Sequence, residues 1–383
     1  MRFAVDAHAI GRHLTGNEVY IRSLLNGFAT LDTSSEFLAY LSLAEASAWV
    51  PARFAKQLVS VNPFKRLGWD LPVGIRRDRP DLLHVQYTAP LACPVPVVVS
   101  VHDVSFLEHP EYFPRARALQ LRWTVKRTVN SATRILTGSE FSRDSIIRAY
   151  GLSGNNIVVV PNAAAPGFRI VSREGAAAFV ASRYRIPTPY ILSVGDLQPR
   201  KNHIGLIAAF AKLVTAYPQL RHRLLLAGKD TWYGACVRAA ARESGVSERI
   251  HFTGFVADDD LLQLYNAADL FVFPSFYEGF GLPILEAMAC GRAVACANTS
   301  AMPEVADGAA ILFDPDSPDS IARAMADLLL DAGLRARMEV LGVQRAAQFS
   351  WRKTAQKTLE VYYEVAENGS RRGVMRPAAV ALG

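Results

Sequence analysis

Short apolar runs alternate with amphipathic segments along the first half of the chain. Residues Arg2–Asp6 have the pattern of a first strand, after which Tyr20, Leu24, Phe28 and Leu31 recur at helical spacing. Further strands rich in Val, Ile and Leu are expected at residues 82–85, 96–101, 134–137 and 157–160. Continuous apolar strands are typical of parallel sheets buried on both faces. The pattern therefore predicts repeated βα units.

The periodicity weakens between Pro161 and Pro189, where a linker is expected, and then restarts. A second series of strands is expected at residues 190–194, 223–227, 250–253, 270–273, 293–297 and 311–313. A last amphipathic helix after Trp351 is expected to pack back on the first domain, and the tail from Asn368 is expected to fray. The chain is thus predicted to be α/β with two doubly wound domains. Their expected bounds are 1–168, completed by the helix over 352–383, and 187–351.

Composition excludes several classes of protein. The chain has 383 residues, of which 50% are hydrophobic and 20% charged, which excludes a disordered or disulfide-stapled chain. Its longest nearly uncharged apolar run, residues 89–101, is shorter than the about 18 residues that a membrane helix needs. Asp6 lies where a signal peptide would need an apolar stretch, so a cytoplasmic location is expected. The four cysteines form no CxxC pair and predict neither a disulfide nor a zinc site.

The net charge of +7 suits nucleic acid, anionic lipid or phosphorylated ligands without choosing among them. No nucleic-acid-binding motif is present, so no nucleic-acid partner is expected. An amphipathic segment over 115–127 is either a solvated helix face or a contact with anionic membrane. Its basic residues are Arg115, Arg117, Arg122, Lys126 and Arg127.

Signals for phosphate binding follow the first strand of the second domain. Neither domain carries GxGxxG or GxxxxGK[ST], so a dinucleotide or Walker-type site is not supported. Arg200 and Lys201 instead stand between the strand over 190–194 and the next helical run. A cation 4 Å from a phosphate oxygen contributes roughly 4 kcal/mol at an effective dielectric of 20, against about 0.3–2 for a helix dipole. Taken alone, the pair would also fit a solvated basic turn.

Two carboxylates flank the turn that follows Phe273. Glu278 and Glu286 lie on either side of a segment with two glycines, which let the main chain approach a ligand closely. Carboxylates accept hydrogen bonds from the paired hydroxyls of a sugar or ribose, and backbone amides can meet oxygens that lack protons. For Glu286 alone, an acid that complements a helix dipole is the alternative.

Two other polar positions have competing interpretations. His102 directly follows an apolar strand and can reach a ligand at the carboxyl end of that strand, although a structural histidine is the alternative. Asp258-Asp259-Asp260 invites comparison with a metal-binding DxD motif. Because residues at helical spacing follow, these acids are expected to cap a helix, and no metal is expected.

Together these segments resemble retaining glycosyltransferases of family 4, which have the GT-B fold. The ExxxxxxxE signature runs from Glu278 to Glu286 within YEGFGLPILEAMACG. The other matching motifs, in family order, are HDVSFLEHPEYF from His102, GSEFSRDSI from Gly138, PRKN from Pro199, FTGFV from Phe252, LYNAADLFVFPS from Leu264 and MPEVADGAAILFDP from Met302. The resemblance covers about residues 1–365 and is nearest to the bacterial mannosyltransferase-like branch that builds surface polysaccharides.

The resemblance implies two Rossmann-like domains facing across a cleft, with the C-terminal helix crossing back to the first. It implies transfer of a hexose to a glycan or lipid-linked acceptor, with GDP-mannose as the leading nucleotide-sugar donor and a UDP-sugar as the second choice. No metal and no cofactor are expected, because cations take the role that a divalent ion fills in DxD enzymes. The basic amphipathic segment over 115–127, and not the resemblance, adds the expectation of a peripheral position at the inner face of the membrane.

The resemblance also assigns roles to single residues. Glu278 would hold the donor-sugar hydroxyls, His102 would lie over the sugar, and Arg200 and Lys201 would neutralise the diphosphate; these are the expected catalytic residues. Glu286 would bind the ribose hydroxyls. The other expected donor-binding residues are Gly16, Gly279, Phe280, Gly281 and Leu282, together with Phe255 and Val256 at the border of the base.

Two positions depart from the family pattern. Glu18 stands where the family's TGxGRY segment has a glycine, and Asp196 stands where the family often has an arginine. Both put negative charge where an anion would bind. A non-catalytic sensor of sugar nucleotides therefore stays as an alternative. A GT-B isomerase or hydrolase that acts on a nucleotide-sugar is a separate one. The sequence does not identify the base, the sugar or the acceptor, which depend on the shape of the pocket.

Overall fold

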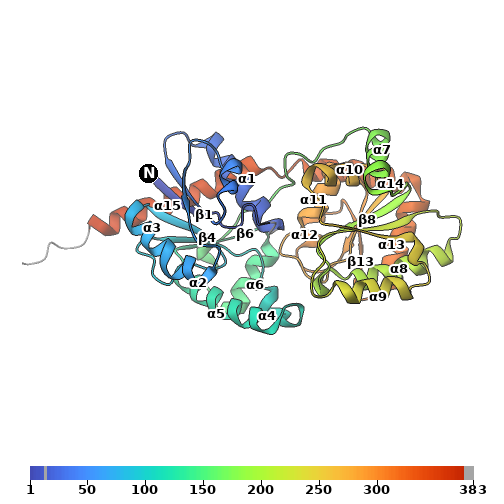
Figure 1. Ribbon diagram of the computed structural model, residues 1–383, viewed down its shortest axis with the longest axis horizontal. Helices are drawn as coiled ribbons and strands as arrows, with labels where there is room; N and C mark the ends of the chain where they lie inside the picture. Colours follow the sequence, from blue (N-terminus) through green and yellow to red (C-terminus); the bar gives the residue numbers. More distant parts are fainter. Residues whose placement is uncertain (13–14, 375–383) are drawn as a thin grey trace, which may run out of the picture. The chain divides into compact units, whose positions relative to one another are not determined.

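The computed structural model describes residues 1–12 and 15–374 (Figure 1). The chain divides into two compact units, and each is a parallel sheet covered by helices. The first unit comprises Met1–Gly138, Arg143–Asn162 and the segment from Trp351 onward, and the second comprises Ser139–Ser142 and Ala163–Ser350. No described helix combines the length and apolarity that a membrane span requires.

The first sheet has the strand order β3-β2-β1-β4-β5-β6-β7, with every neighbouring pair parallel. Its central strands are buried on both faces, which explains their continuous apolar sequences. The strand bounds are β1 Arg2–Asp6, β2 Glu36–Leu41, β3 Ala55–Leu58, β4 Leu82–Gln86, β5 Val97–Ser100, β6 Arg134–Thr137 and β7 Ile157–Val159.

Helices of the first unit connect these strands. The longer helices are α1 Thr15–Leu31, α3 Leu71–Asp78, α5 Arg115–Ser131, α6 Glu140–Tyr150 and α15 Trp351–Val374. The short ones are α2 Pro63–Lys65, α4 Ser105–Glu108, η1 Glu45–Trp49, η2 Arg66–Asp70, η3 Pro110–Tyr112 and η4 Gly154–Asn156. Helix α15 continues to Val374, past Asn368, where fraying was predicted to begin, and residues 375–383 of the expected C-terminal helix lie outside the described residues.

Helix α15 packs against α1, as the sequence predicts for the C-terminal helix. The two helices approach closely at Gly27, where an added Cβ would lie 2.4 Å from the Cβ of Ala355. Tyr362 of α15 is fully buried, and its hydroxyl lies 2.5 Å from His84 Nδ1 on β4. A segment far away in sequence therefore completes the core of the first unit.

The second sheet has the strand order β10-β9-β8-β11-β12-β13, also parallel throughout. Its strands are β8 Tyr190–Val194, β9 Arg223–Ala227, β10 Ile250–Gly254, β11 Leu270–Phe273, β12 Val294–Ala297 and β13 Ile311–Phe313. Its helices are α7 Arg173–Tyr184, α8 His203–Ala216, α9 Gly234–Glu243, α10 Asp258–Ala267, α11 Leu282–Ala289, α12 Met302–Ala306, α13 Pro318–Leu330 and α14 Ala332–Ala346, with the short η5 Pro199–Lys201 and η6 Ser247–Arg249.

The structure differs from the predicted elements in three places. Strands β2 and β3 had no prediction; β3 has the sequence AKQL, is not buried and lies at the edge of the sheet, so it carries no apolar run. The expected linker contains helix α7, which packs against α10 in the second unit through Ala176 and Val180. Small alanine side chains hide its periodicity. Residues from Ala163 onward therefore group with the second unit, earlier than the predicted start at 187.

Candidate active site

The strand order of the second sheet reverses between β8 and β11, and charged residues gather at this point. From β8 the chain continues to β9 and β10 on one side, whereas from β11 it continues to β12 and β13 on the other. Ligands of open α/β sheets bind beyond the carboxyl ends of the strands at such a reversal. Arg200 and Lys201 lie in η5, shortly after β8, and Glu278 lies in the turn after β11.

Both cations bind the Glu278 carboxylate. Lys201 Nζ lies 2.6 Å from Oε1, and Arg200 Nη1 lies 2.5 Å from Oε2. Arg200 Nη1 also donates to the carbonyl of Tyr277 at 2.7 Å. The Lys201 ammonium lies 4.9 Å from the centre of the Phe273 ring, within the range of a cation–π contact. The structure thus brings three predicted site residues into one cluster.

The backbone sets the positions of these cations. Pro199 lies in the first turn of η5, and Asn202 ends it with φ of 52° and starts α8 as its N-cap. The Asn202 side chain also donates to the carbonyl of Pro315 at 2.8 Å. The amide of Phe276 donates to the carbonyl of Arg200 at 2.9 Å, which joins η5 to the turn after β11. Local geometry therefore holds the basic pair at the reversal point.

The cluster retains an excess of positive charge. Burial would raise the pKa of the Glu278 carboxyl, but the charges of Arg200 and Lys201 and the hydrogen bond from Lys201 hold it at about 2. Burial lowers the pKa of the Lys201 ammonium, and the Glu278 carboxylate opposes that shift. Glu278 is therefore ionised at neutral pH and balances one of the two cations. The remaining positive charge suits an anionic ligand.

Glu286 has the opposite environment, inside α11. Its Oε2 accepts a hydrogen bond of 2.9 Å from the hydroxyl of Tyr265, which is fully buried. Burial raises the pKa of Glu286 to about 7, although the Tyr265 hydrogen bond and the charge of Lys201 lower it. The two glutamates of one signature thus differ widely in acidity, because one is paired with cations and the other is mainly desolvated.

Backbone geometry shapes the turn between the two glutamates. Gly281 has φ of +101° and precedes α11, with Pro283 in the first helical turn. L residues rarely adopt this φ, so glycine is required here. The Phe280 side chain is buried in the core, with its ring centre 5.9 Å from that of Phe349. The expected donor contact of Phe280 is therefore restricted to its backbone.

In the first unit, the strand order of the sheet reverses between β1 and β4. His102, which follows β5, lies close to this point. Its Nε2 lies 3.1 Å from Oε1 of Gln86, and its ring meets the ring of Tyr20 edge-on with centres 4.6 Å apart. Burial lowers the pKa of His102 to about 4, so the imidazole is neutral at pH 7. With the Gln86 oxygen as acceptor, Nε2 carries the proton and Nδ1 is a hydrogen-bond acceptor.

A buried hydrogen-bonded chain supports Tyr20 and His102. The Tyr20 hydroxyl lies 2.8 Å from Ser100 Oγ, which lies 2.7 Å from His84 Nε2. Burial lowers the pKa of His84 to about 3. His84, with Tyr362 on its other nitrogen, therefore has a structural role.

The two departures from the family pattern have local partners. Glu18 Oε1 accepts a hydrogen bond of 2.9 Å from the amide of Gly11, and Gly16 is exposed in the first turn of α1. Asp196 Oδ1 accepts from the amide of Lys229 at 3.0 Å, and Lys229 Nζ lies 3.8 Å from Oδ2. Lys229, which follows β9, thus lies close to Asp196, which follows β8.

The remaining predicted positions lie around β10. Phe255 is 50% exposed, whereas Val256 is buried, so only Phe255 presents a large side chain to solvent. The acids 258–260 begin α10, but no side chain caps that helix, so the capping prediction is wrong. They complement the helix dipole instead, and Asp260 accepts from the Tyr184 hydroxyl at 2.6 Å. Among the described residues, no cluster of three or more His, Cys, Asp or Glu could hold a metal ion.

Sequence reasoning missed the residues that support the predicted ones. Tyr265 binds Glu286, Ser300 Oγ accepts from the amide of Glu278 at 2.9 Å, and Lys229 lies beside Asp196. In the sequence, Tyr265 has the spacing of a core residue of the helix that became α10, so it did not indicate a site. The position of Lys229 just after a predicted strand could have indicated a residue of the site.

Comparison with known proteins identifies the family. The model of group 1 glycosyl transferases matches residues 181–342, and that of Glycosyltransferase Family 4 matches residues 15–166. "O-antigen chain mannosyltransferase B" of Escherichia coli is 36% identical over 267 residues, which cover 69% of each chain. This chain belongs to glycosyltransferase family 4. It is a hexosyltransferase, as the sequence motifs predict.

Three further proteins are similar to this family 4 enzyme. "Serotype-specific mannosyltransferase WbdA" of Escherichia coli is 32% identical over 232 residues, but the match spans only 28% of that protein and 60% of this chain. Sucrose-phosphate synthase from Thermosynechococcus elongatus has a TM-score of 0.76 at 19% identity, covering 95% of this chain and 98% of that one. HepE of Anabaena, in complex with UDP and glucose, has a TM-score of 0.75 at 19% identity, covering 95% and 100%. These likenesses confirm the GT-B fold.

Proposed function

We propose that this family 4 enzyme transfers mannose from GDP-mannose, with retention of configuration, to a glycan or lipid-linked acceptor in surface polysaccharide synthesis. The observation that carries the proposal is the cluster of Arg200, Lys201 and Glu278 at the reversal point of the second sheet. The names of the Escherichia coli relatives support mannose and a polysaccharide product. They favour transfer over an isomerase or hydrolase.

In this proposal Arg200 and Lys201 bind the diphosphate of the donor and Glu278 binds hydroxyls of its sugar. As the bond to the anomeric carbon breaks, negative charge grows on the diphosphate and the two cations stabilise it. The acceptor hydroxyl attacks from the same face and gives its proton to a phosphate oxygen, so no protein nucleophile is assigned. His102 of the first unit would contact the sugar, and the backbone of Gly279 to Leu282 would bind oxygens of the donor.

The rest of the donor site follows the same scheme. Glu286 would accept hydrogen bonds from the ribose hydroxyls, and Phe255 would border the base. Gly16 would approach the donor from the first unit. Helix α5 would contact anionic membrane, which its exposed Leu119 and Trp123, 66% and 61% accessible, support.

The base of the donor can be tested by thermal shift. Adding GDP, UDP and ADP separately to the full chain is expected to raise the melting temperature most with GDP, because a ligand stabilises the folded state that binds it. A Glu286→Gln variant serves as the control and should lose most of the shift. A larger shift with UDP would replace GDP-mannose by a UDP-sugar, the donor type suggested by the HepE complex. No shift with any nucleotide would contradict the proposed function.

Nucleotide affinity is expected to depend on pH through Glu286. Because its pKa is raised to about 7 and ribose hydroxyls bind the ionised carboxylate, a nucleotide must displace a proton below neutral pH. Affinity for GDP should therefore rise about tenfold between pH 6 and pH 8. Calorimetry on Glu286→Gln, which cannot ionise, should show only the pH dependence of the nucleotide itself. An equal pH dependence in both proteins would exclude Glu286 as its source.

A further inference from the structure

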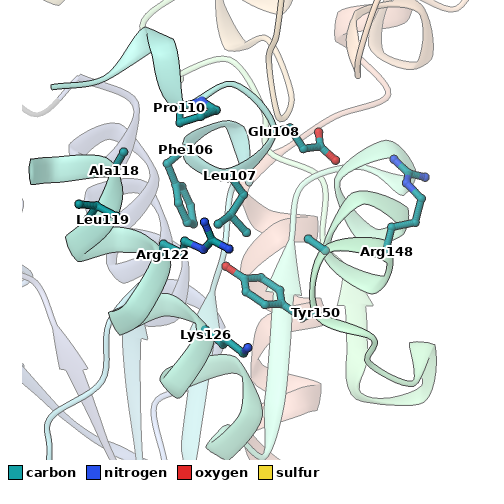
Figure 2. Close-up of a pocket in the computed structure, with 11 residues that line it drawn as sticks. Phe106, Leu107, Glu108, Pro110, Ala118, Leu119, Arg122, Lys126, Arg148 and Tyr150 are labelled. Carbon is teal, nitrogen blue, oxygen red and sulfur yellow. The ribbon is translucent and has the colours of Figure 1, made fainter. Parts of the chain in front are cut away.

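A cavity away from the charged cluster lies in the first unit, among α4, η3, α5 and the C-terminal end of α6 (Figure 2). Its volume is about 480 Å³, enough for a small ligand. None of the residues proposed to bind the donor lines it. Phe106, Leu107, Glu108 and Pro110 belong to the HDVSFLEHPEYF motif, but the proposed transfer reaction assigns them no role.

Three cations line this cavity. Arg122 and Lys126 are four residues apart on α5 and share one face of that helix, while Arg148 projects from α6. Arg148 donates to Ser145 Oγ at 2.9 Å, and no ion pair joins any of the three to a carboxylate among the side chains that the structure describes. Glu108 is the carboxylate among the lining residues. The cavity thus has an excess of two positive charges.

An unsatisfied donor is aimed into the same space. The Tyr150 hydroxyl is buried and has no hydrogen-bond partner. Figure 2 shows it pointing toward the guanidinium of Arg122 in the middle of the cavity. Burial raises the pKa of Tyr150, so the hydroxyl keeps its proton and remains a donor. A buried polar group without a partner is unfavourable, and a ligand that accepts its hydrogen bond would remove that cost.

The remaining walls are apolar. Phe106 is buried and its ring lies beside Leu107 in the cavity, and Leu119 continues the wall toward solvent with 66% of its surface exposed. Trp123, one turn further along α5, is 61% exposed. A small inorganic anion would leave these surfaces in contact with water. A ligand with a charged head and an apolar substituent would cover both kinds of surface.

We propose that this cavity binds a phosphoryl group carried on an apolar substituent. The guanidinium of Arg122, the ammonium of Lys126 and the hydroxyl of Tyr150 supply donors from different directions, which matches the several oxygens of a phosphate ester. Arg148 adds a cation at the edge of the cavity. The same chemistry occurs in the headgroup of an anionic lipid and in a free alkyl phosphate, and the tests below separate these two sources.

The first test is calorimetry of the full chain with hexyl phosphate, inorganic phosphate and hexyl glucoside. Hexyl phosphate should bind more tightly than inorganic phosphate, and the uncharged glucoside should not bind measurably. Arg122→Gln should weaken hexyl phosphate binding by about tenfold or more, because it removes a charge-assisted contact. Arg115→Gln is the matched control: it removes the same charge from α5 outside the cavity and should have little effect. Equal loss in both variants, or binding of the glucoside as tight as that of the phosphate, would overturn the proposal.

The second test uses Tyr150→Phe, which removes one oxygen and keeps the ring. Since the hydroxyl has no partner in the fold, the melting temperature should stay the same or rise, while hexyl phosphate binding weakens by about fivefold or more. A variant that melts lower and binds hexyl phosphate normally would show that the hydroxyl serves the fold and not the cavity, contrary to the proposal.

Vesicles then identify the source of the phosphoryl group. Sedimentation with phosphatidylcholine vesicles, with and without phosphatidic acid, is compared for Arg122→Gln and Arg115→Gln. If Arg122→Gln loses more binding to the acidic vesicles, the ligand is a lipid headgroup. If both variants sediment alike while only Arg122→Gln loses hexyl phosphate binding, the ligand is a free phosphate ester. Both results support a phosphoryl site, and failure of hexyl phosphate to bind the wild-type chain refutes it.

Discussion

Lys201→Ala is expected to lower the rate of sugar transfer by about a hundredfold to a thousandfold, the cost of removing one group that stabilises developing negative charge. The ammonium lies beside Glu278 and Phe273 on a side chain that is only 13% exposed, so water screens it less than a surface charge. The measurement is a transfer assay with the donor identified by thermal shift. Near-normal transfer would show that Lys201 does not neutralise the leaving group.

Controls separate this effect from a loss of fold. Lys212→Ala removes an exposed lysine of α8 that pairs with Asp319, and it should leave transfer unchanged. Lys201→Ala leaves Glu278 paired with Arg200 alone, which makes burial of the carboxylate less favourable. Lys201→Gln, which retains a donor at this position, should therefore be measured beside it, with circular dichroism on both. Two folded variants that are both slow would assign the loss to the missing charge.

Glu278→Gln is expected to slow transfer by about a hundredfold while the affinity for free nucleotide stays the same or increases. In the structure the Glu278 carboxylate occupies both cations that the donor's diphosphate is proposed to need. A neutral amide of the same shape would leave those cations available to phosphate, but it would bind the sugar hydroxyls less strongly. Kinetics of transfer and calorimetry with the free nucleotide measure the two effects separately.

Glu286→Gln is the matched comparison, since both glutamates belong to one signature and both are buried. It should weaken nucleotide affinity more than Glu278→Gln does, because its proposed partner is the ribose. The reverse order, with Glu278→Gln losing the nucleotide and Glu286→Gln losing only transfer, would exchange the two roles.

The ion-paired state of Glu278 also has a consequence for donor binding. The diphosphate must compete with a carboxylate that lies 2.5 and 2.6 Å from the two cations. When the diphosphate takes those cations, Glu278 becomes available for hydroxyls of the sugar. Binding of the leaving group and orientation of the sugar would thus be linked through one side chain, which raises the advantage of a complete donor over a free nucleotide.

The hydrophobic pattern by itself determined most of the architecture. Arg2–Asp6, Arg134–Thr137, Tyr190–Val194, Arg223–Ala227 and Leu270–Phe273 were predicted as strands with the bounds that the structure has. Buried parallel strands must be apolar on both faces, so each appears in the sequence as a continuous apolar run that can be recognised. The edge strand β3 was not predicted because little of it is buried. Helix α7 was not predicted because its buried side chains are small.

Motifs likewise placed the charged residues at the carboxyl ends of strands, but only the tertiary structure decided how those charges interact. Arg200 and Glu278 are far apart in the chain and meet because β8 and β11 are neighbours in the sheet. That contact makes Glu278 strongly acidic, whereas burial beside Tyr265 brings the pKa of Glu286 to about 7. Residue identity sets which groups can ionise; solvent exclusion and the nearest charges, which depend on the complete fold, set the pH at which they do so.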